Sequence, residues 1–551
     1  MRLLIYPAAA ACALFQIALA AAADPPPQTV TYSLDAALGG GIVAMGSDAE
    51  TLLKNLAGLE ANAPEELERW IAQLGSDSFA SRESATRELF KLMGTHPSAV
   101  IPRLQQAAES GEPEVRNRCK QLLGLSPPQM IDGLIEWIYL KRIPGMLEFF
   151  EGLPAATWND ARRLRLPEVI ERVAVEDDRP RLLEWAGHEL PPFRQASLRA
   201  LAKLGGDPAL AALADDPQAL VRLELAIHWG KLSDARCVPL LQSLVGEEDF
   251  QINSISAYAL QRLTGEYFGF PGTATPEGRE QIARSWRELD IGEAKFPLDL
   301  PSSLVSNEPS GHKLFLLEEG VGLLRTYDEN GQLIATQEPM FNSSANDVIP
   351  MDDGEVLLCG ENLDESYGWY ISKRDNTQVV RKSLRNSYPC PTLISNGNLL
   401  ICEQRRAYET DPRDALVLNL NLDGHSGRNS WRTHYGTTLV AVSQAIFEFD
   451  VNGELVWRHD FDTDFVTICQ GLRNGNVLVI LRRSNRIIEL THDHRIAWEW
   501  RPAKGTVRDS FMLPSGNLLA TTDAGAMEVS RGKHLLWEIE EEGIWQVRRG
   551  E

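Results

Sequence analysis

A histidine and three arginines in the C-terminal half of the chain carry side chains of the kind that a group-transfer site needs. Arg432 and His434 stand just before a run of apolar residues, and Arg405 and Arg406 lie in the segment "CEQRRAYETDPRDA". A histidine can act as a nucleophile, and guanidinium groups can stabilise the charge that develops during transfer. Because the sequence does not show that these groups converge, we assign no catalytic residue and keep the four as candidates.

A second polar group, His492, Asp493 and His494, offers two imidazoles and a carboxylate to a metal ion. The three residues occupy the position where other segments of the chain have "DVNG" or "DENG" turns. We therefore interpret them as an outer turn with its side chains in water. Because no further segment supplies a third ligand, no metal site is predicted.

Composition and charge limit the classes of partner. The 551 residues are 43% hydrophobic and 24% charged, which is ordinary for a globular protein and long enough for two or more domains. The formal net charge of −23 repels phosphate backbones and anionic lipids, and no basic stripe interrupts it. Nucleic acid is therefore not an expected partner.

The N-terminus has the features of an export signal. Arg2 is followed by an apolar run over residues 3–19 and by small residues suited to cleavage after Ala20 or Ala23. We predict a signal peptide at 1–23, an N-terminal extension at 24–62, and a periplasmic or secreted protein with no membrane span after cleavage. An N-terminal membrane anchor, or a lipid on Cys12, is the alternative.

Six cysteines remain after the predicted cleavage, and none forms a C-x-x-C motif. Export permits disulfides, while buried thiols that act as small apolar groups are the other interpretation. Cys359 and Cys402 hold the same position in neighbouring strand repeats, so they could face one another. The six are Cys119, Cys237, Cys359, Cys390, Cys402 and Cys469.

Residues 63–291 carry apolar residues at helical spacing, broken by turn residues every ten to twenty positions. An apolar residue followed by arginine recurs near the start of the second helix of a pair. Its copies are Val115-Arg116, Phe193-Arg194 and Val221-Arg222, with Ile252-Asn253 as a variant. Such a repeat predicts stacked helix pairs, an α-solenoid, with the arginines as ties between repeats.

After a proline-bearing linker at 292–305, residues 306–551 repeat one glycine turn and apolar strand every 38 to 43 positions. The copies are "GHKLFL" from Gly311, "GEVLLC" from Gly354, "GNLLIC" from Gly397, "TTLVAV" from Thr437, "GNVLVI" from Gly475 and "GNLLAT" from Gly516. Most are followed by a second hairpin, often with a tryptophan behind it, as at Trp457, Trp498 and Trp537.

Four strands in about forty residues form the blade of a β-propeller. Six copies predict six blades, with seven as the alternative, and each repeated strand is expected to be an inner strand. The tryptophans are interpreted as packing between sheets. The chain ends where the next strand is due, so residues 544–547 are expected to close the ring by pairing with the first blade near Leu314 and Leu316.

The segments "EPEVRNR" and "DPQALVRLELA" resemble HEAT-repeat proteins of the phycobilisome-lyase-like type. Residues 255–289, "ISAYALQRLTGEYFGFPGTATPEGREQIARSWREL", look like the terminal repeat of exported bacterial HEAT proteins. The resemblance implies a HEAT-type, armadillo-like architecture and says little about function.

The elements "NGNLLI" and "FDVNGELVW" resemble the PQQ-like propeller superfamily, in particular its arylsulfotransferase-type blade. That resemblance implies a histidine nucleophile with further histidine and arginine groups at the central channel, for which His434, Arg432, Arg405 and Arg406 are the nearest material. The chain lacks the adjacent cysteines and the Thr-Gly hairpins of quinoprotein dehydrogenases. PQQ is therefore not predicted, and no other cofactor is.

We therefore expect an exported, non-enzymatic binding or scaffolding protein with a protein partner, built from an α-solenoid and an all-β propeller. The alternatives are an enzyme of arylsulfotransferase-like or other type, or a small-ligand sensor, with its site at the central channel. A histidine and an arginine that point into the channel would favour the enzyme.

Overall fold

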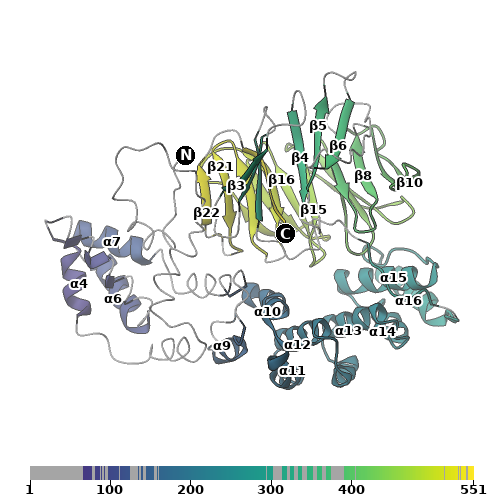
Figure 1. Cartoon of the computed structure of the whole chain (residues 1–551), viewed down its shortest axis with the longest axis horizontal. Helices are drawn as coiled ribbons and strands as arrows, with labels where there is room; N and C mark the ends of the chain where they lie inside the picture. Colours follow the sequence, from purple (N-terminus) through teal and green to yellow (C-terminus); the bar gives the residue numbers. More distant parts are fainter. Residues whose placement is uncertain are drawn as a thin grey trace.

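The architecture is that of a computed structural model, in which a helical N-terminal region precedes a β-propeller (Figure 1). The residues it describes are 66–76, 78, 81–82, 84–86, 88–89, 92, 97–110, 112–123, 135, 138–139, 144–153, 158, 160–292, 294–301, 313–318, 323–327, 333–337, 344–350, 356–362, 368–373, 390–403, 405–513, 516–531, 533, 535–540 and 544–550. The predicted signal peptide and N-terminal extension lie outside these residues, and so does Cys12.

The helices of the N-terminal region bury two separate apolar clusters, one within residues 67–122 and one that begins at residue 135. The helices are α4 (Leu67–Gln73), α6 (Pro97–Ser110), α7 (Pro113–Leu123), α9 (Leu147–Gly152), α10 (Asp160–Val173), α11 (Arg179–Trp185), α12 (Pro191–Lys203), α13 (Ala219–Lys231), α14 (Cys237–Leu244), α15 (Phe250–Thr264) and α16 (Pro276–Glu288). In Figure 1, α10 to α16 form a row below the sheets, with α15 and α16 below β8 and β10. None of the described helices is long and apolar enough to cross a membrane.

Two of the three repeated arginines, Arg194 and Arg222, bond to a segment between helices farther along the chain, whereas Arg116 is exposed. Arg194 of α12 donates from Nε and Nη2 to both oxygens of Asp216, at 2.6 and 2.8 Å. Arg222 of α13 donates to the Asp216 carbonyl oxygen at 2.6 Å and to Glu247 Oε1 at 2.7 Å. Where the repeat has Asn253, the side-chain amide donates to the Glu247 carbonyl oxygen at 3.0 Å. Each of these side chains therefore connects its own helix to a segment between helices, at Asp216 or at Glu247.

We expect Asp216→Ala to lower the free energy of unfolding by about 3–5 kcal/mol, because it leaves the Arg194 guanidinium buried without its carboxylate. Asp234→Ala is the matched control. Asp234 also accepts the backbone N–H two residues on, but its partner Arg236 keeps 60% of its side chain exposed. That pair is expected to contribute at most about 1 kcal/mol. Urea unfolding of both variants measures the difference, and equal losses would contradict the role of the tie.

The predicted linker lies partly against the helices. Leu298 belongs to the buried helical core, and its backbone N–H donates to the Gly230 carbonyl oxygen at 2.9 Å. A Cβ at Gly230 would lie 2.8 Å from Leu298 Cδ2, so only glycine allows this approach. Residues up to 301 therefore form part of the helical region in space.

The propeller consists of six sheets. Their strands are β1 (Lys313–Glu318), β2 (Leu324–Tyr327), β3 (Leu333–Gln337), β4 (Ser344–Pro350), β5 (Val356–Asn362), β6 (Gly368–Lys373), β7 (Cys390–Leu393), β8 (Leu399–Glu403), β9 (Arg406–Thr410), β10 (Leu416–Asn421), β11 (Gly427–Arg432), β12 (Thr438–Val442), β13 (Ala445–Phe449), β14 (Leu455–Asp460), β15 (Val466–Gly471), β16 (Val477–Leu481), β17 (Arg486–Leu490), β18 (Ile496–Trp500), β19 (Val507–Met512), β20 (Leu518–Thr522), β21 (Gly525–Val529), β22 (Leu535–Glu540) and β23 (Ile544–Gly550). The strand orders are β23-β1-β2-β3, β4-β5-β6, β7-β8-β9-β10, β11-β12-β13-β14, β15-β16-β17-β18 and β19-β20-β21-β22.

The prediction of six four-stranded blades is wrong, and so is the seven-blade alternative. Five sheets have four strands and are full blades, while the sheet β4–β6 has three strands in the described part of the chain. The first strands β23, β4, β7, β11, β15 and β19 contact one another in that order and return to β23, so the sheets form a closed ring. The repeat predicted one strand more for the β4–β6 sheet than the structure shows.

The closure of the ring is confirmed, and the placement of the repeated strand is corrected. β23 pairs antiparallel with β1, with Val547 opposite Leu316. The repeated apolar strand is the second strand of its sheet and not the innermost, as β8, β12, β16 and β20 show. The innermost strand precedes the glycine turn, because that turn joins the first strand to the second.

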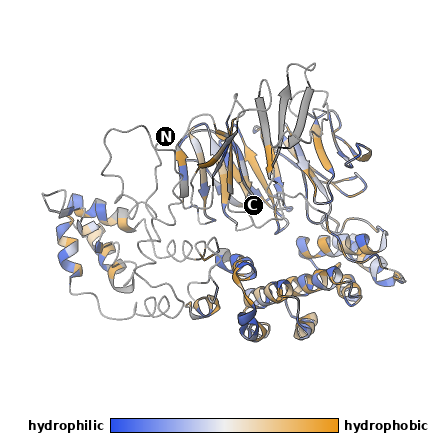
Figure 2. Cartoon of the chain, viewed as in Figure 1, coloured by the Kyte–Doolittle hydropathy of each residue, from blue (hydrophilic) through white to orange (hydrophobic). Residues whose placement is uncertain are grey.

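Many propeller strands are coloured as hydrophobic, whereas the helices carry hydrophobic and hydrophilic residues on different faces (Figure 2). In β12, β13, β16, β20 and β21 every residue is buried. Cys119, Cys237 and Cys469 are free, buried thiols, and burial raises the pKa of Cys119 and of Cys237 to about 11. Cys402 is also buried, and its register partner on β7 is Cys390, while Cys359 lies on β5 of another sheet.

A buried glutamate on the third strand explains the residue that follows the turn glycine. That residue donates a hydrogen bond to the glutamate in each of four sheets. The pairs are Asn398 with Glu409, Thr437 with Glu448, Asn476 with Glu489, and Asn517 with Glu528. The repeated "GN" is therefore a buried polar contact within each blade, and burial without such a partner would be costly.

Two of these glutamates also bind a basic side chain from the next sheet. His492 Nε2 lies 2.5 Å from Glu448 Oε2, and Arg531 pairs with Glu489. His492 and Arg531 both stand second in the turn between the third and fourth strands of their sheets. We call this contact, from the second turn residue to the glutamate of the preceding sheet, the blade latch.

The repeated tryptophans join the same sheets, as predicted. Trp457 and Trp498 lie directly opposite Glu448 and Glu489 in register. Their Nε1–H groups donate to the backbone carbonyl oxygens of the latch residues, His492 and Arg531, at 2.9 Å. The side chain of Trp537 lies outside the described residues.

Candidate functional site

The strongest candidate site is the junction where the helices meet the propeller. Helix α15 begins with Phe250, behind the N-cap Asp249, whose Oδ1 accepts the Ile252 N–H at 3.0 Å. The Phe250 ring stacks on the latch residue His492 with centroids 3.7 Å apart, and it meets the Tyr435 ring edge-on at 5.3 Å. Tyr435 belongs to the buried core of the helical region, so the two parts share one apolar cluster.

Two glycines of the propeller lie directly under α15. A Cβ at Gly436 would lie 2.4 Å from Tyr258 Cε2, and one at Gly475 would lie 2.9 Å from Phe250 Cδ1. Both glycines have positive φ, at 86° and 82°, in the turn between the first and second strands of their sheets. The turn therefore satisfies two demands that only glycine meets, a left-handed backbone and close approach of a helix.

The loop after α15 extends the junction to an outer strand. The Tyr267 hydroxyl donates to Asp450 Oδ2, and the Thr273 hydroxyl donates to the Val456 carbonyl oxygen at 2.9 Å. Farther along the row of helices, Glu168 of α10 lies 3.8 Å from Arg473 of the propeller. The helices thus contact the face that carries the first-to-second and third-to-fourth strand turns.

The structure separates the four candidate residues. Arg432 ends β11 and His434 lies in the following turn, on the face that the helices contact. Arg405 and Arg406 lie at the turn between β8 and β9, at the opposite end of the strands. Arg406 pairs there with Glu403 at 3.1 Å. The four residues therefore do not form one group.

His434 lies beside Arg473, whose side chain is 3.8 Å from Glu168 of α10. Its Nε2 donates to the Arg473 carbonyl oxygen at 3.0 Å, which fixes the neutral tautomer with the proton on Nε2. Burial, together with the nearby Arg473 guanidinium, lowers the pKa of His434 to about 4, although the hydrogen bond to the Arg473 backbone opposes this fall. Burial also raises the pKa of Glu171 on α10, while Arg199 and Arg473 oppose that rise. The ring is therefore neutral at pH 7 and holds its turn by a hydrogen bond.

Arg432 is a buried structural cation. Its Nη1 donates to the Gly436 carbonyl oxygen at 2.8 Å, and its Nη2 pairs with Glu409. Gly436 lies in the turn that contacts α15, and Glu409 lies on the preceding sheet. Arg432 therefore connects that turn to the neighbouring sheet. The sequence did not identify Glu409, Tyr258 or Phe250, although the glutamate recurs 11 to 13 residues after the turn residue that binds it.

The resemblance to arylsulfotransferase-type propellers implies a histidine nucleophile at the central channel. None of the innermost strands that the structure describes contains one. Side chains of these strands bind the neighbouring strand instead. Gln470 donates to the Met512 carbonyl oxygen at 3.0 Å and accepts the Met512 N–H at 2.8 Å, and Thr392 donates to the Ser430 carbonyl oxygen at 2.9 Å.

No cluster of three or more metal-binding side chains occurs within the described ranges. The expectation that His492, Asp493 and His494 all face water is wrong for His492, which is buried against Glu448 because it forms the blade latch. His494 Nδ1 lies 2.9 Å from His459 Nδ1, and Asp493 pairs with Arg495.

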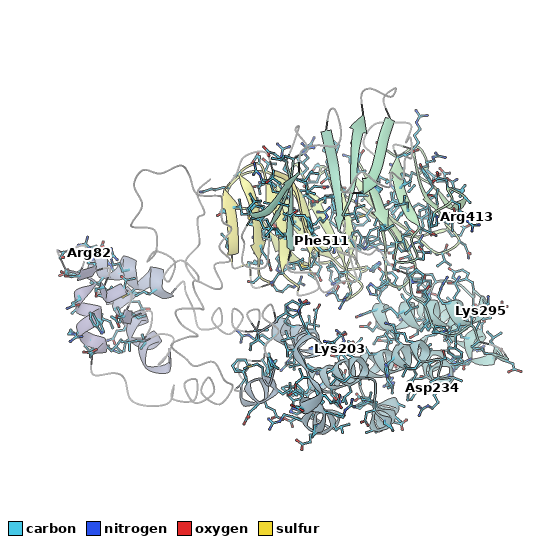
Figure 3. The ribbon with its side chains drawn as sticks, viewed as in Figure 1. Arg82, Lys203, Asp234, Lys295, Arg413 and Phe511 are labelled. Atoms are coloured by element: carbon cyan, nitrogen blue, oxygen red, sulfur yellow. The ribbon has the colours of Figure 1, made fainter. Side chains whose placement is uncertain are left out.

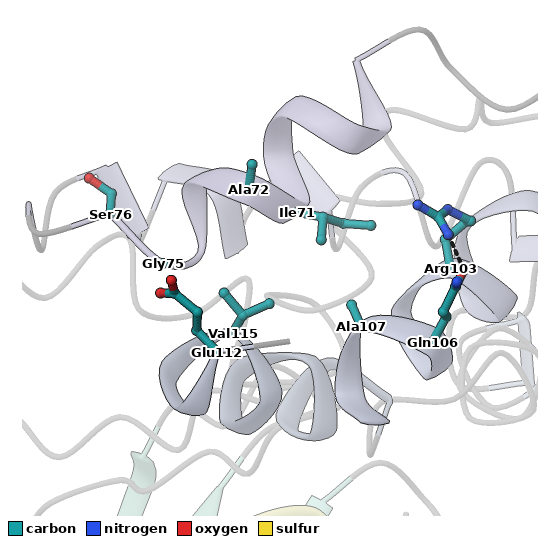
Figure 4. A pocket seen from close by; sticks show the side chains of 9 residues that line it. All are labelled: Ile71, Ala72, Gly75, Ser76, Arg103, Gln106, Ala107, Glu112 and Val115. Carbon is teal, nitrogen blue, oxygen red and sulfur yellow. Dashed lines mark hydrogen bonds between the residues drawn. The ribbon is translucent and has the colours of Figure 1, made fainter. Parts of the chain in front are cut away.

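Cavities lined by described residues lie both in the helical region and at the junction. One, of about 540 Å³, is between α4 and the α6–α7 pair (Figure 4), and its Arg103 is held by Glu68 at 2.6 Å. A second, of about 630 Å³, opens beside Trp229 and Arg236 on α13 and α14. The third, of about 520 Å³, lies at the junction over Arg432 and Glu409. Of these three, the third is lined by described residues of both the helical region and the propeller.

The ring of sheets defines the C-terminal part as a β-propeller. No protein-family model and no curated protein matches the chain. Among solved structures, a protein of unknown function from Bacteroides caccae is 15% identical over 43% of this chain and 97% of its own, with a TM-score of 0.36.

Two further structures are similar to the propeller part. Virginiamycin B lyase from Staphylococcus aureus is 12% identical over 44% of this chain and 85% of its own, with a TM-score of 0.33. The WD40 β-propeller domain of Doa1 is 12% identical over 44% of this chain and 86% of its own, with a TM-score of 0.35. At these scores the similarities carry no argument about activity, and the propeller is defined by its own sheets.

Proposed function

We propose that the protein is an exported, non-enzymatic binding or scaffolding protein that acts in the periplasm or outside the cell. In this proposal residues 63–291 form a HEAT-type α-solenoid, 292–305 a linker and 306–551 the propeller. The observation that supports it best is the junction, where Phe250 and Tyr435 share one apolar cluster. Such an interface would hold two broad surfaces in a constant relation, which suits a platform for a protein partner.

The solenoid is supported by the arginine ties. Arg194 and Arg222 repeat one geometry, each reaching a carboxylate 22 or 25 residues farther along the chain. The two arginines themselves stand 28 residues apart, which is the step between successive helix pairs in the sequence. A stack of similar pairs offers an extended surface to a polypeptide partner.

The propeller face away from the helices is the proposed contact surface. It carries the connections between sheets, at 422–426, 461–465 and 501–506. Phe465 in one connection is 39% exposed, with the Arg483 guanidinium 5.2 Å from its ring centroid. Exposed aromatic and arginine side chains are enriched where binding energy concentrates in protein interfaces.

An enzyme of arylsulfotransferase-like type is the alternative. The positions of the four candidate residues do not favour it. His434 and Arg432 lie at the junction, and Arg405 and Arg406 at the other end of the strands. A transfer site would need these groups to converge on one reacting atom.

A photo-crosslinking amino acid at position 465, in the protein expressed in its source cells, is expected to give one discrete adduct with a partner protein. The same group at Ile334, an exposed residue of β3, is the control and is expected to give none. Identical adducts from both positions would contradict the proposed surface.

The purified protein is expected to turn over neither aryl sulfates nor alcohols with added PQQ and calcium. Sulfate transfer that disappears in His434→Ala would overturn the proposal and make the junction an active site.

A further inference from the structure

The junction cavity lies where the propeller departs from its own repeat. Val451 occupies the turn position that His492 and Arg531 hold in the following sheets. Because valine has no basic group, it cannot form the blade latch with Glu409 of the preceding sheet. Leu418 lies opposite Glu409 in register, where the two following sheets place a tryptophan opposite their glutamate. Two large side chains are therefore replaced by small apolar ones at a single sheet boundary.

The space left by these replacements has a rigid polar floor. Glu409 accepts from Asn398 Nδ2 at 2.5 Å and pairs with Arg432, and all three side chains are buried. Arg432 replaces the missing latch residue as the cationic partner of Glu409, but it comes from the end of β11 and not from the turn between the third and fourth strands. The floor is thus organised in advance, which lowers the cost of ordering side chains when a ligand binds.

The helical region supplies the opposite wall. Tyr258, Gln261 and Arg262 of α15 line the cavity, together with Lys295 and Pro301. Figure 3 shows Lys295 on the helical part, on the same side of the molecule as Arg413 of the propeller. Tyr258 is 8% exposed and burial raises its pKa, so it stays a neutral phenol that can donate a hydrogen bond.

The charges of the lining suit a single negative charge. Arg262, Lys295 and Arg432 are opposed by Glu409 in the lining and by Asp299, which lies 3.3 Å from Arg262. One positive charge is left over, in a chain whose formal net charge is −23. That excess of one positive charge matches a monoanion such as a carboxylate.

The remaining lining suits hydroxyl groups. Asn396, Asn398 and Gln261 offer amides that donate and accept, and Glu409 offers carboxylate oxygens. Val417 and Val451 add apolar contacts for a carbon skeleton. The volume of about 520 Å³ lies within the usual range of small-molecule sites, roughly 300–1,000 Å³.

We propose that the junction cavity binds a small polyhydroxy carboxylate such as a uronic acid, with its carboxylate at Lys295 and Arg262 and its hydroxyl groups over the Glu409 floor. This site is distinct from the central channel and from the protein-binding surface around Phe465. It therefore stands or falls independently of the scaffold proposal.

Isothermal titration of the full-length mature protein with glucuronate, glucose and inorganic phosphate tests the site. Glucuronate is expected to bind at least tenfold more tightly than glucose or phosphate. Val451→Arg, which restores the latch residue of the last sheet, is expected to weaken glucuronate binding more than tenfold without lowering the melting temperature. Lys295→Met is expected to remove the preference over glucose, while Lys533→Met, an exposed lysine of another turn, leaves it unchanged.

Three results would overturn the proposal. They are the absence of glucuronate binding to the unaltered protein, equal binding of phosphate, and glucuronate binding that Val451→Arg and Lys295→Met leave intact. The last result would place any bound sugar acid outside this cavity.

Discussion

Removal of β23, by deletion of residues 544–551, is expected to unfold the propeller. Ile544 and Val547 are buried, and Val547 lies opposite Leu316 of β1. Burial of each such side chain contributes about 1.5–3 kcal/mol. The deletion also exposes the backbone groups of β1 and opens the contacts of β23 with β19 and β4. Because whole domains are stable by only about 5–15 kcal/mol, this loss is comparable to the total.

Far-ultraviolet circular dichroism during thermal unfolding measures the effect as loss of the β-sheet transition. A point substitution separates closure from chain length. Val547→Asp places a charge in the ring at a fully buried position, whereas Ile334→Asp places it on the exposed surface of β3 in the same sheet. We expect the first to abolish cooperative unfolding and the second to change stability by about 0.5 kcal/mol or less. A folded propeller in the Val547 variant would contradict closure by β23.

The repeat period predicted the order of helices and sheets because the local spacing of apolar residues shows which face of each element is buried. The Arg194 and Arg222 ties followed from the same period, since each recurs at one place in a helix pair. The number of full blades did not follow, because a strand count depends on pairing between segments that the period treats alike. The innermost strand was misplaced for a related reason, as the glycine turn marks the second strand more clearly than the first.

The candidate site was harder to predict because its residues come from segments far apart in the chain. Arg432 and Arg406 are close in sequence but lie at opposite ends of the strands, since successive strands are antiparallel. Glu409 is one of several charged residues in the segment "EQRRAYETD", and its role depends on the register that places it opposite Leu418. The sequence already places Val451 in the same turn position as His492, but the contact that His492 and Arg531 make with the glutamate of the preceding sheet is visible only in the structure.

Substitution of Gly436 by alanine is expected to release the helices from the propeller. Gly436 and Gly516 hold equivalent turn positions with φ of 86° and 79°, so alanine strains both backbones by a similar amount, about 1–2 kcal/mol. At Gly436 the new Cβ would also lie 2.4 Å from the Tyr258 ring, whereas at Gly516 no atom lies within 4 Å. The ring must therefore move, at a further cost of about 1–3 kcal/mol.

Differential scanning calorimetry distinguishes the two glycines. The unaltered protein and Gly516→Ala are expected to unfold with helices and propeller coupled, the latter at a slightly lower temperature. Gly436→Ala is expected to show two separate transitions, because the cluster around Phe250 and Tyr435 opens when Tyr258 is displaced. Equal profiles for the two variants would mean that α15 does not hold the parts together.

A double-substitution cycle attributes the effect to one contact. If the methyl group of Gly436→Ala acts by clashing with the tyrosine ring, Tyr258→Ala removes the clash. The double variant then loses stability only through the backbone strain and the absence of the ring. The loss from Gly436→Ala should then be smaller by about 1–3 kcal/mol in the Tyr258→Ala background than in the unaltered protein. No such interaction is expected between Gly516→Ala and Tyr258→Ala, whose positions share no contact. Additive losses at Gly436 would show that its substitution acts through the turn alone, and the junction would then have to rest on Phe250 and Tyr267.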